Sequence, residues 1–588
     1  MTFKNVYYDT KRNKIHLWEQ INGENFYDNI YWTPYAFIPC HDGEIETIEG
    51  KKVAKKTFES NKDYYNFCKK NKESEIYENE VVPTIQFLAE RYHKIPTDEM
   101  KAPDLKTYSV DIEVHSESGM FPSIENPEDP IVLISVTNIK TGEVFCFGEK
   151  EITKKFNYNY KYFNCGSEEK LLKQFLSWWH KNPPDVITGW NVTADYKVNV
   201  TGGFDLPYII NRCKNLFEKK IYKLLSPINI IDIRYKEETK SYVVDIAGIS
   251  VIDYMALYKW YTSNNLESHS LETVCQHELG KGKLEYENDL KWLYYNDWNT
   301  YVEYNIEDTF LIKELEDKLK YIKLAQSLSL LCKCPLKSYS STTKLIEGLM
   351  LTRFRRNNKC APHFKGGSKP YYPAAHVIEP QKNKYNWVIS FDITSSYPFA
   401  IITCNMSLET LYGKILNLHE DDIIEYTRNS NFPQIQINKN GRNVKLKGKD
   451  LEKFNKAIEK KLFSVAPNGS LFINGKRGVY AEMESDVFLK RKKIKKLMSD
   501  KFKEYEKTKD PNIKQEAENL NTYQLALKVV INGAYGVTAV PYSRYFNPHI
   551  AEAITAVGRC SLKSGKIFIN EIMNDFGDDI KTVLNEIG

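Results

Sequence analysis

Hydrophobic and polar residues alternate in several short stretches of the chain, and this pattern predicts β-strands. In residues 107–116 the alternation places Asp111 and Glu113 together on one face of a strand. The opposite face is apolar and consists of Tyr108, Val110, Ile112 and Val114. Residues 131–148 predict a hairpin around 140–143, so we expect a partly antiparallel sheet. Residues 183–191 predict a short buried strand.

Other stretches carry apolar residues at helical spacing. They predict helices over 61–72, from Asp205 onward, over 297–319, from Glu484 to Lys509 and over 547–576. Asp510-Pro511-Asn512 breaks the fourth of these, and a further helix is expected through Lys528. The expected apolar side of the helix from Glu484 is Phe488, Leu489, Leu497, Met498 and Phe502. The first hundred residues also contain strand-like runs at 13–21 and 31–40, which indicate no chemistry.

Length and composition limit the class of protein. A chain of 588 residues must divide into several cores, roughly three to five domains. It has no apolar run of about 20 residues and no signal peptide, so we expect a soluble intracellular protein without a membrane partner. The 11 cysteines are scattered, which favours reduced structural thiols and no structural metal. A net charge of +5 is too small to indicate nucleic acid by itself.

Carboxylates at separate points of the chain form the first candidate site. Tyr304 and Asp308 lie one turn apart on the helix predicted over 297–319. With the acidic residues of the earlier segments they make a set of candidate metal ligands, Asp111, Glu113, Asp205 and Asp308. Such a set can hold two ions about 4 Å apart on a phosphodiester. Oxygen ligands favour Mg²⁺ or Mn²⁺, and Tyr304 would orient an attacking water.

The order of these motifs resembles that in proofreading DNA polymerases. Asp-Ile-Glu, Gly-Trp-Asn with Phe-Asp-x-Pro-Tyr-Ile, and Tyr-x3-Asp are similar to the three exonuclease motifs of family B, in the branch of the T-even bacteriophages. The chain departs from that family by an insertion between Asn191 and Asp205, which contains a second candidate asparagine, Asn199. Asp205 is the expected ligand because Leu-Pro-Tyr-Ile-Ile follows it, and Asp195 is the alternative.

A second constellation resembles the polymerase motif A of family B. Residues 384–391 predict a strand that turns sharply after Asp392. The resemblance implies that Asp392 binds two catalytic metal ions and that the carbonyl of Ile393 reaches one of them. It also implies that the amides of Ser395 and Ser396 cradle the triphosphate, and that Tyr397 lies under the incoming sugar and excludes a 2′-hydroxyl. Upstream, Tyr-Tyr-Pro-Ala-Ala-His-Val stands in the place of a small-residue motif that contacts template DNA.

The helices on either side of Pro511 resemble polymerase fingers. Lys528, Asn532 and Tyr535 fall on one stripe and are followed by Gly536, as in motif B of family B. The resemblance implies that Lys528 neutralises the triphosphate and Asn532 lines the nucleotide site, with Tyr535 and Gly536 near the nascent base pair. On the preceding basic helix, alignment with the phage family places Arg491 and Lys495 on the triphosphate. The other basic residues there are expected to be solvated.

The resemblance implies a multidomain α/β protein with an RNase H-like 3′→5′ exonuclease domain, an incomplete palm and helical-hairpin fingers. The expected divisions are an N-terminal domain (1–105), the exonuclease domain (106–320), a return segment of the N-terminal domain (321–363), the palm (364–477), the fingers (478–540) and the start of a second palm segment (541–588).

The family continues beyond this point with a hairpin bearing Tyr-x-Asp-Thr-Asp, a thumb and a clamp-binding tail. Here Gly-Asp-Asp, at 577–579, and a few further residues follow the last helix, and we interpret Asp578 and Asp579 as a solvated turn. We therefore expect a split polymerase in which a second polypeptide supplies that hairpin, the thumb and contact with the sliding clamp. Primer-template DNA, single-stranded DNA and dNTPs are the expected ligands, with two Mg²⁺ or Mn²⁺ ions per active site, in the cytoplasm of a viral host. The alternatives are a stand-alone exonuclease with a vestigial polymerase region and an inactive DNA-binding fragment.

Overall fold

The computed structural model describes the chain except residues 72–73, 97–99, 263–265, 365, 378, 380–381, 385–389, 391, 440 and 588, and it describes side chains as far as residue 572. The chain forms two compact units. Unit 1 contains residues 1–34, 58–63 and 82–348, and unit 2 contains residues 35–57, 64–81 and 349–588. Across the described residues, no helix is both long enough and apolar enough to cross a membrane.

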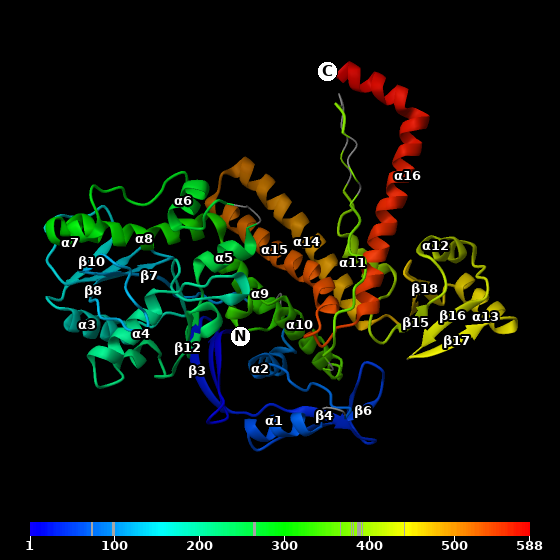
Figure 1. Cartoon of the computed structure of the whole chain (residues 1–588), viewed down its shortest axis with the longest axis horizontal. Helices are drawn as coiled ribbons and strands as arrows, with labels where there is room; N and C mark the ends of the chain where they lie inside the picture. The colour runs from blue at the N-terminus through cyan, green and yellow to red at the C-terminus, as the bar shows by residue number, and fades with distance from the viewer. Residues whose placement is uncertain are drawn as a thin grey trace. The chain divides into compact units, whose positions relative to one another are not determined.

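A six-stranded mixed sheet forms the centre of unit 1 (Figure 1). Its order is β10-β9-β8-β7-β11-β14, with β7 antiparallel to β8 and parallel to β11. The strands are β7 (Thr107–Val114), β8 (Ile131–Asn138), β9 (Val144–Gly148), β10 (Tyr160–Asn164), β11 (Val186–Thr188) and β14 (Ser250–Val251). The strand, the hairpin and the short buried strand predicted between residues 107 and 191 are therefore confirmed.

Helices cover both faces of this sheet. The apolar face of β7 packs with α3 (Glu168–Lys181) and α4 (Asp205–Leu216) in one core. On the other face, side chains of β8 and β9 pack against α8 (Trp298–Leu319). Because Asp111 and Glu113 alternate with the apolar residues of β7, they point to the face that α8 covers. The predicted helices at Asp205 and over 297–319 are confirmed.

The rest of unit 1 surrounds this layer. An antiparallel sheet consists of β1 (Thr2–Asp9), β2 (Lys14–Ile21) and β3 (Glu24–Tyr31), and a hairpin consists of β12 (Ile231–Lys236) and β13 (Ser241–Ile246). The remaining helices are α2 (Pro83–Tyr92), α5 (Tyr254–Tyr261), α6 (Leu271–Leu279), α7 (Leu290–Asn296), α9 (Tyr321–Cys332) and the start of α10 (Thr342–Arg356).

Unit 2 contains a second sheet, a small sheet and long helices. The five-stranded sheet has the order β17-β16-β15-β19-β18, and its core includes residues of α12 and α13. Its elements are β15 (Leu411–Ile415), α12 (Glu420–Asn429), β16 (Ile435–Lys439), β17 (Arg442–Leu446), α13 (Lys449–Glu459), β18 (Phe463–Val465) and β19 (Ser470–Ile473). The small sheet contains β4 (Ala36–Pro39), β5 (Ile45–Glu46) and β6 (Lys52–Lys56), and α1 (Asn61–Lys70) follows it in sequence.

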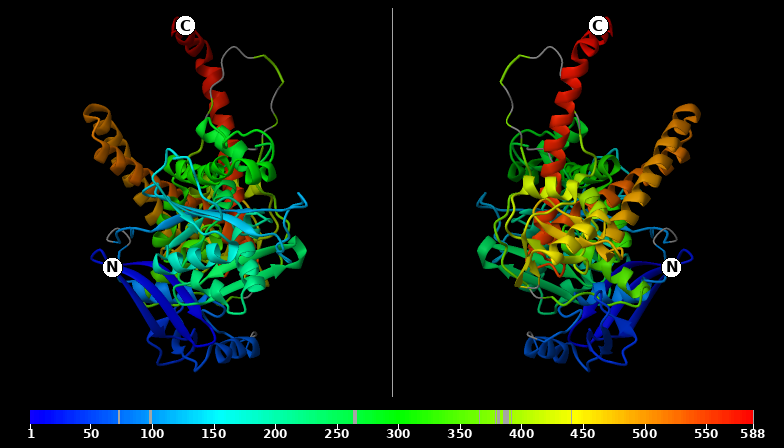
Figure 2. Two further views of the ribbon diagram at one scale, coloured as in Figure 1. Left: turned by 90° about the vertical axis from the view of Figure 1, so that its left-hand side faces the viewer. Right: turned by 90° about the vertical axis from the view of Figure 1, so that its right-hand side faces the viewer.

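The predicted helical hairpin is present in unit 2. Helix α14 (Val479–Thr508) and helix α15 (Pro511–Ala539) lie side by side and form a rod of two helices (Figures 1 and 2). The second helix runs through Lys528 and Tyr535, as predicted, and ends at Ala539. The expected apolar side of α14 is wrong at Leu489 and Leu497, which are each 52% exposed. The buried side chains of α14 all lie in its N-terminal part, between Val479 and Val487, so packing decides which apolar residues are covered.

Two further expectations concern α11 (Ser396–Thr403) and α16 (Pro548–Ile587). The strand predicted over 384–391 falls largely on 385–389 and 391, which lie outside the described residues. The sharp turn after it is present, because Ser395 has a φ of 56° immediately before α11. The interpretation of Asp578 and Asp579 as a turn is wrong, since both lie within the bounds of α16.

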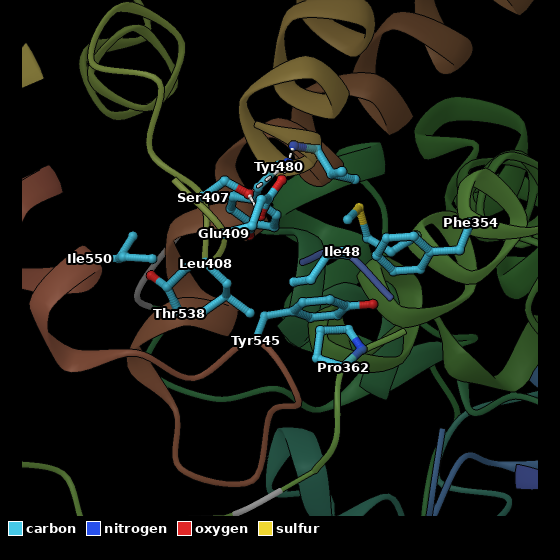
Figure 3. A pocket seen from close by; sticks show the side chains of 12 residues that line it. Ile48, Phe354, Pro362, Ser407, Leu408, Glu409, Tyr480, Thr538, Tyr545 and Ile550 are labelled. Atoms are coloured by element: carbon cyan, nitrogen blue, oxygen red, sulfur yellow. Dashed lines mark hydrogen bonds between the residues drawn. The ribbon is translucent and has the colours of Figure 1, made fainter. Parts of the chain in front are cut away.

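The start of α14 is capped by a distant segment. Gly478 precedes the helix. It has no side chain that could accept hydrogen bonds from the free N–H groups of the first helical turn. Instead, the amide of Val479 donates to Glu409 Oε1 at 2.6 Å and that of Tyr480 donates to Ser407 Oγ at 3.2 Å. Figure 3 shows Ser407, Glu409 and Tyr480 together beside a small apolar cavity. A Cβ at 478 would lie 2.5 Å from that of Ser407, so only glycine fits this approach.

Two arginines from late in the chain bind backbone carbonyls of early segments of unit 2. Arg544 donates to the carbonyls of Pro362 at 2.8 Å and of Asn79 at 2.6 Å. Arg559 donates to the carbonyls of Pro373 at 2.7 Å and of Ala374 at 2.9 Å. Both side chains are buried. The segment around residue 373 forms no helix or strand, so Arg559 supplies hydrogen bonds that regular structure would otherwise supply.

Glu484 is a buried carboxyl whose two oxygens have no hydrogen-bond partner among the described residues. Burial raises its pKa well above the usual value. A raised pKa in the folded state means that folding favours the protonated form, so stability falls as the pH rises above the usual glutamate range. We predict that Glu484→Met increases the free energy of unfolding by about 1–3 kcal/mol at pH 8 and by less at pH 4, measured by urea denaturation.

Glu482→Met is the matched control. Glu482 lies on the same helix, but it is partly exposed and pairs with Arg353. A partly exposed ion pair contributes little, so we expect a change below about 1 kcal/mol with no comparable pH trend. A Glu484→Met variant that is destabilised at pH 8 would contradict the assignment of an unfavourable buried carboxyl.

Candidate active site

The two acidic residues of β7 start the candidate site in unit 1. Asp111 and Glu113 share the face of β7 that lies beneath α8, and Glu113 is 9% exposed. Val110 and Ile112 point the opposite way into the core. The apolar face therefore fixes the strand, and the carboxylates have no freedom to turn outward without breaking that packing.

Asp205 is held directly against this strand. It is the first residue of α4 and is buried. Its Oδ1 accepts a hydrogen bond from the amide of Ile112 at 3.2 Å. Because Ile112 lies between Asp111 and Glu113 in sequence, this bond brings the third carboxylate beside the first two. The structure thus places the sequence-predicted acidic residues of β7 and α4 together.

Helix α8 brings the remaining predicted residues to the same place. Asp308 and Tyr304 are buried on its inner side, as the i, i+4 spacing predicts. Asn305, next to Tyr304, donates from Nδ2 to Asp111 Oδ2 at 2.5 Å. Lys283 reaches the cluster from the loop between α6 and α7 and donates from Nζ to Asp308 Oδ2 at 2.6 Å and to the Tyr304 hydroxyl at 2.8 Å.

Burial and mutual repulsion dominate the electrostatics of this cluster. The pKa of Asp111 lies well above its usual value because of burial first and the charges of the other three carboxylates second. Burial and the charge of Asp308 raise the pKa of Glu113 to about 8. Burial raises the pKa of Asp205 to about 8 and also raises the pKa of Asp308, although Lys283 opposes the latter shift. The cluster therefore attracts positive charge.

The four carboxylates are ligands of the type that divalent ions prefer, but their side chains are not arranged around a common metal position. Asp308 Oδ1 is buried and has no hydrogen-bond partner, as expected of an oxygen that awaits a cation. Across the described residues, however, no three acidic, histidine or cysteine side chains are arranged as a metal-ligand set. Asn305 and Lys283 engage Asp111 Oδ2 and Asp308 Oδ2 instead, so a bound ion would compete with Lys283 for the charge of Asp308.

The alternative ligand Asp195 lies elsewhere. Its Oδ1 accepts from the amide of Lys197 at 3.1 Å, and its Oδ2 accepts from the Tyr339 hydroxyl at 3.1 Å. The nearby Asn191 side chain accepts from the amide of Gly203 at 2.8 Å and so closes the base of the insertion. Asn199 ends the short helix η2 (Tyr196–Val198) in the left-handed conformation. Neither Asp195 nor Asn199 has a described hydrogen bond to the carboxylate cluster.

The residues predicted from motif A lie in unit 2. Asp392 is exposed and has no hydrogen bond to the other described residues, and Ile393 is 42% exposed. Ser395 and Ser396 form the turn into α11. Tyr397 lies against Tyr535 of α15, with ring centroids 4.9 Å apart. The structure therefore brings together the two tyrosines that were predicted from motif A and motif B.

The remaining predicted residues are distributed along the helical rod. Lys528 and Asn532 are exposed on α15, Lys495 is exposed on α14, and Arg491 is partly buried. Gly536 follows Tyr535 on α15. No hydrogen bond or ion pair joins these side chains to Asp392 among the described residues. The rod thus presents cations and an amide along its surface, and it contacts α11 through Tyr535 of α15 and Phe488 of α14.

Sequence reasoning missed Lys283, Asn305 and Arg559. Asn305 had a local signal, because it follows Tyr304 and lies one turn before Asp308 on the same helix. Lys283 lies in a loop without periodicity, and Arg559 is one basic residue on a helix. For both of these, only the folded chain reveals the partner.

Two protein-family models match this chain. The model of DNA polymerase family B, exonuclease domain, matches residues 52–274. The model of DNA polymerase family B matches residues 336–585. These matches place the protein in the class of DNA polymerases that carry an exonuclease domain. The chain belongs to DNA polymerase family B.

Curated relatives come from phages and from cellular organisms. The DNA-directed DNA polymerase of Escherichia phage RB69 is 25% identical, over 94% of this chain and 65% of that protein. That of Enterobacteria phage T4 is 26% identical over the same shares. The DNA polymerase delta catalytic subunit of Candida albicans is 26% identical, over 80% of this chain and 42% of that protein. This chain thus spans 65% of the length of each phage relative. These matches do not support the expectation that a second chain is needed.

Lys283 supplies the closest positive charge to the carboxylate cluster. We predict that Lys283→Met lowers the free energy of unfolding at pH 8 by about 3 kcal/mol in metal-free buffer. The loss should be smaller at pH 6, because the raised pKa values leave more of the carboxyls protonated there. Added Mn²⁺ should stabilise the variant more than the parent, since the ion no longer competes with an ammonium group. Urea denaturation with and without Mn²⁺ measures both effects.

Lys281→Met is the control for this comparison. Lys281 lies two residues away and pairs with Glu307 and Glu314 at the surface, so its loss should change stability by less than about 1 kcal/mol. Equal losses in the two variants, or a loss in Lys283→Met that does not depend on pH, would show that Lys283 does not compensate the cluster.

Proposed function

We propose that this chain is a DNA-directed DNA polymerase with 3′→5′ exonuclease activity that acts in viral DNA replication. Its substrates are dNTPs, primer-template DNA and single-stranded DNA. The observation that carries the proposal is the carboxylate cluster of Asp111, Glu113, Asp205 and Asp308, which three distant segments bring together in a buried site. Family membership supports the polymerase part.

The exonuclease domain is proposed to have an RNase H-like fold. The sheet order supports this, because a run of three antiparallel strands, β9-β8-β7, is extended by β11 and β14 in parallel. Asp111, Glu113, Asp205 and Asp308 would hold Mg²⁺ or Mn²⁺. Bound ions of this kind stabilise the charge that develops on the attacking and leaving oxygens of a phosphodiester.

Tyr304 and Lys283 have roles that follow from their own geometry. Burial raises the pKa of Tyr304, so its phenol stays protonated at neutral pH. Lys283 donates to the phenol oxygen, and the phenol also hydrogen-bonds with Asp308, so the hydroxyl is fixed beside a carboxylate of the cluster. Tyr304 therefore positions the nucleophile rather than deprotonating it. Lys283 holds that hydroxyl in place.

The polymerase site is proposed to form around α11 and the start of α15. Asp392 and the Ile393 carbonyl would hold the catalytic ions, and the amides of Ser395 and Ser396 would bind the triphosphate. Arg491, Lys495 and Lys528 would neutralise the triphosphate, with Asn532 lining the nucleotide site. Tyr397 and Tyr535 would pack against the sugar and the nascent pair, beside Gly536. The contact between the two tyrosines supports this arrangement.

For the exonuclease activity, we predict that the full chain shortens single-stranded DNA from its 3′ end in the presence of Mg²⁺. Asp308→Asn should reduce the rate by at least about a hundredfold, because it removes a charged ligand from the site. Tyr304→Phe should reduce kcat more than it raises KM, since the hydroxyl positions the nucleophile. Gel separation of an end-labelled oligonucleotide measures the rate.

Asp317→Asn is the matched control, because Asp317 lies on the same helix, is exposed and pairs with Lys313. This variant should digest DNA at the parental rate. The assignment of the site would be wrong if the Asp308→Asn variant retained full activity. It would also be wrong if the purified parent protein left the DNA intact.

For the polymerase site, we predict that Tyr397→Ala raises ribonucleotide incorporation relative to deoxyribonucleotide incorporation by about tenfold or more. The reason is that the side chain would no longer block the 2′-hydroxyl. Primer extension with each nucleotide type measures the ratio. Asp392→Asn serves as the negative control, and extension by that variant at the parental rate would remove Asp392 from the mechanism.

A further inference from the structure

A cavity of about 400 Å³ in unit 1 is lined by none of the four carboxylates of the cluster. It is bounded by η2 of the insertion before Asp205, by the β12–β13 hairpin and by the segment from Pro335 to the start of α10. Its walls contain an unusual share of positive charge, with the side chains of Lys197, Arg234, Lys236, Lys337 and Lys344. Three carboxylates, Asp195, Asp245 and Asp253, also line it.

Each of these carboxylates already has partners. Asp245 pairs with Arg234 and with Lys337, the latter at 2.9 Å. Asp253 accepts from the amides of Ala256 at 3.2 Å and Thr193 at 3.4 Å and so caps α5. Asp195 accepts from the amide of Lys197 and from Tyr339. The acidic residues of the cavity therefore stabilise the walls and leave part of its positive charge unmatched.

Lys197, Lys236 and Lys344 carry that unmatched charge. Within the described part of the chain, none of their ammonium groups forms a hydrogen bond or an ion pair with a carboxylate. Lys236 lies over the ring of Tyr196, with Nζ 3.8 Å from the ring centroid. Burial first, and neighbouring lysines second, lower the pKa values of Lys197 and Lys344. Lys197 and Lys236 are exposed and Lys344 is partly buried, so the open cavity concentrates ammonium groups that are available to an anion.

We propose that this cavity binds a phosphate group, carried by a free nucleotide or by the backbone of single-stranded DNA. A phosphate has several acceptor oxygens and can accept from two or three ammonium groups at once. Lys236, which lies over the ring of Tyr196, adds a third ammonium group to the same cavity. Lys197 and Tyr196 belong to the insertion between Asn191 and Asp205, so this segment has a binding role of its own.

The test measures acylation of individual lysines in the full chain by mass spectrometry. Because a lowered pKa increases the fraction of neutral amine, Lys197 and Lys344 should react readily when the cavity is empty. Inorganic phosphate, dTMP and a thymidine hexanucleotide are added separately in chelator-treated, metal-free buffer, where no metal-dependent cleavage takes place. At least one of them should slow acylation of Lys197 and Lys344 and leave Lys170, an exposed lysine of α3, unchanged.

The double variant Lys197→Gln/Lys344→Gln should bind the protecting ligand at least about tenfold more weakly in calorimetric titration. Lys170→Gln should bind it as the parent does. Protection by phosphate and dTMP would identify a free-nucleotide site, whereas protection by the hexanucleotide alone would identify the strand backbone. The proposal is overturned if none of the three protects, if sodium chloride at equal ionic strength protects as well, or if the double variant binds like the parent. Because no cleavage is measured, failure of the exonuclease proposal would leave this result readable.

Discussion

Repulsion between buried carboxylates is the constraint on which unit 1 depends. Four acidic side chains share one site, and in water they would separate. The fold holds them together with one backbone amide, one side-chain amide and one ammonium group, those of Ile112, Asn305 and Lys283. Ile112 and Asn305 come from β7 and α8, which apolar cores fix, and Lys283 comes from the loop between α6 and α7. The sheet order is therefore not a neutral scaffold, because the site exists only when β7, α4 and α8 are packed on one another.

The parts of this site that could be predicted from the sequence are those with a local signal. Alternation in β7 separates Asp111 and Glu113 from the core side chains, and helical spacing in α8 aligns Tyr304 with Asp308. Lys283 has no such signal, because its partners Tyr304 and Asp308 are 21 and 25 residues away in sequence. The same limit applies to α14, where Leu489 and Leu497 satisfy the helical pattern but have no facing element to bury them. Local pattern thus predicts which element forms, and packing decides what it covers.

The start of the helical rod is built by two segments of unit 2, one that precedes α14 and one that follows α11. Gly478 permits the close approach of the chain after α11 but cannot cap α14. Ser407 and Glu409 supply the acceptors, and a negative side chain at a helix N-terminus is also favourable electrostatically. The segment that follows Tyr397 therefore sets where α14 begins. Tyr397 itself contacts α15. Both helices of the rod are therefore positioned by contacts with the stretch from Tyr397 to Glu409.

The hydrogen bonds of Arg544 and Arg559 set an order of events for the growing polypeptide. Asn79 is among the first residues of unit 2 to be made, yet its carbonyl is bound by an arginine 465 positions later. The carbonyls of Pro373 and Ala374 likewise lack their donor until Arg559 has been synthesised. Contacts so distant in sequence require large loops to close and form slowly. All residues of unit 1, which ends at residue 348, are synthesised before Arg544 and Arg559, so unit 1 can fold while these carbonyls of unit 2 still lack their donors.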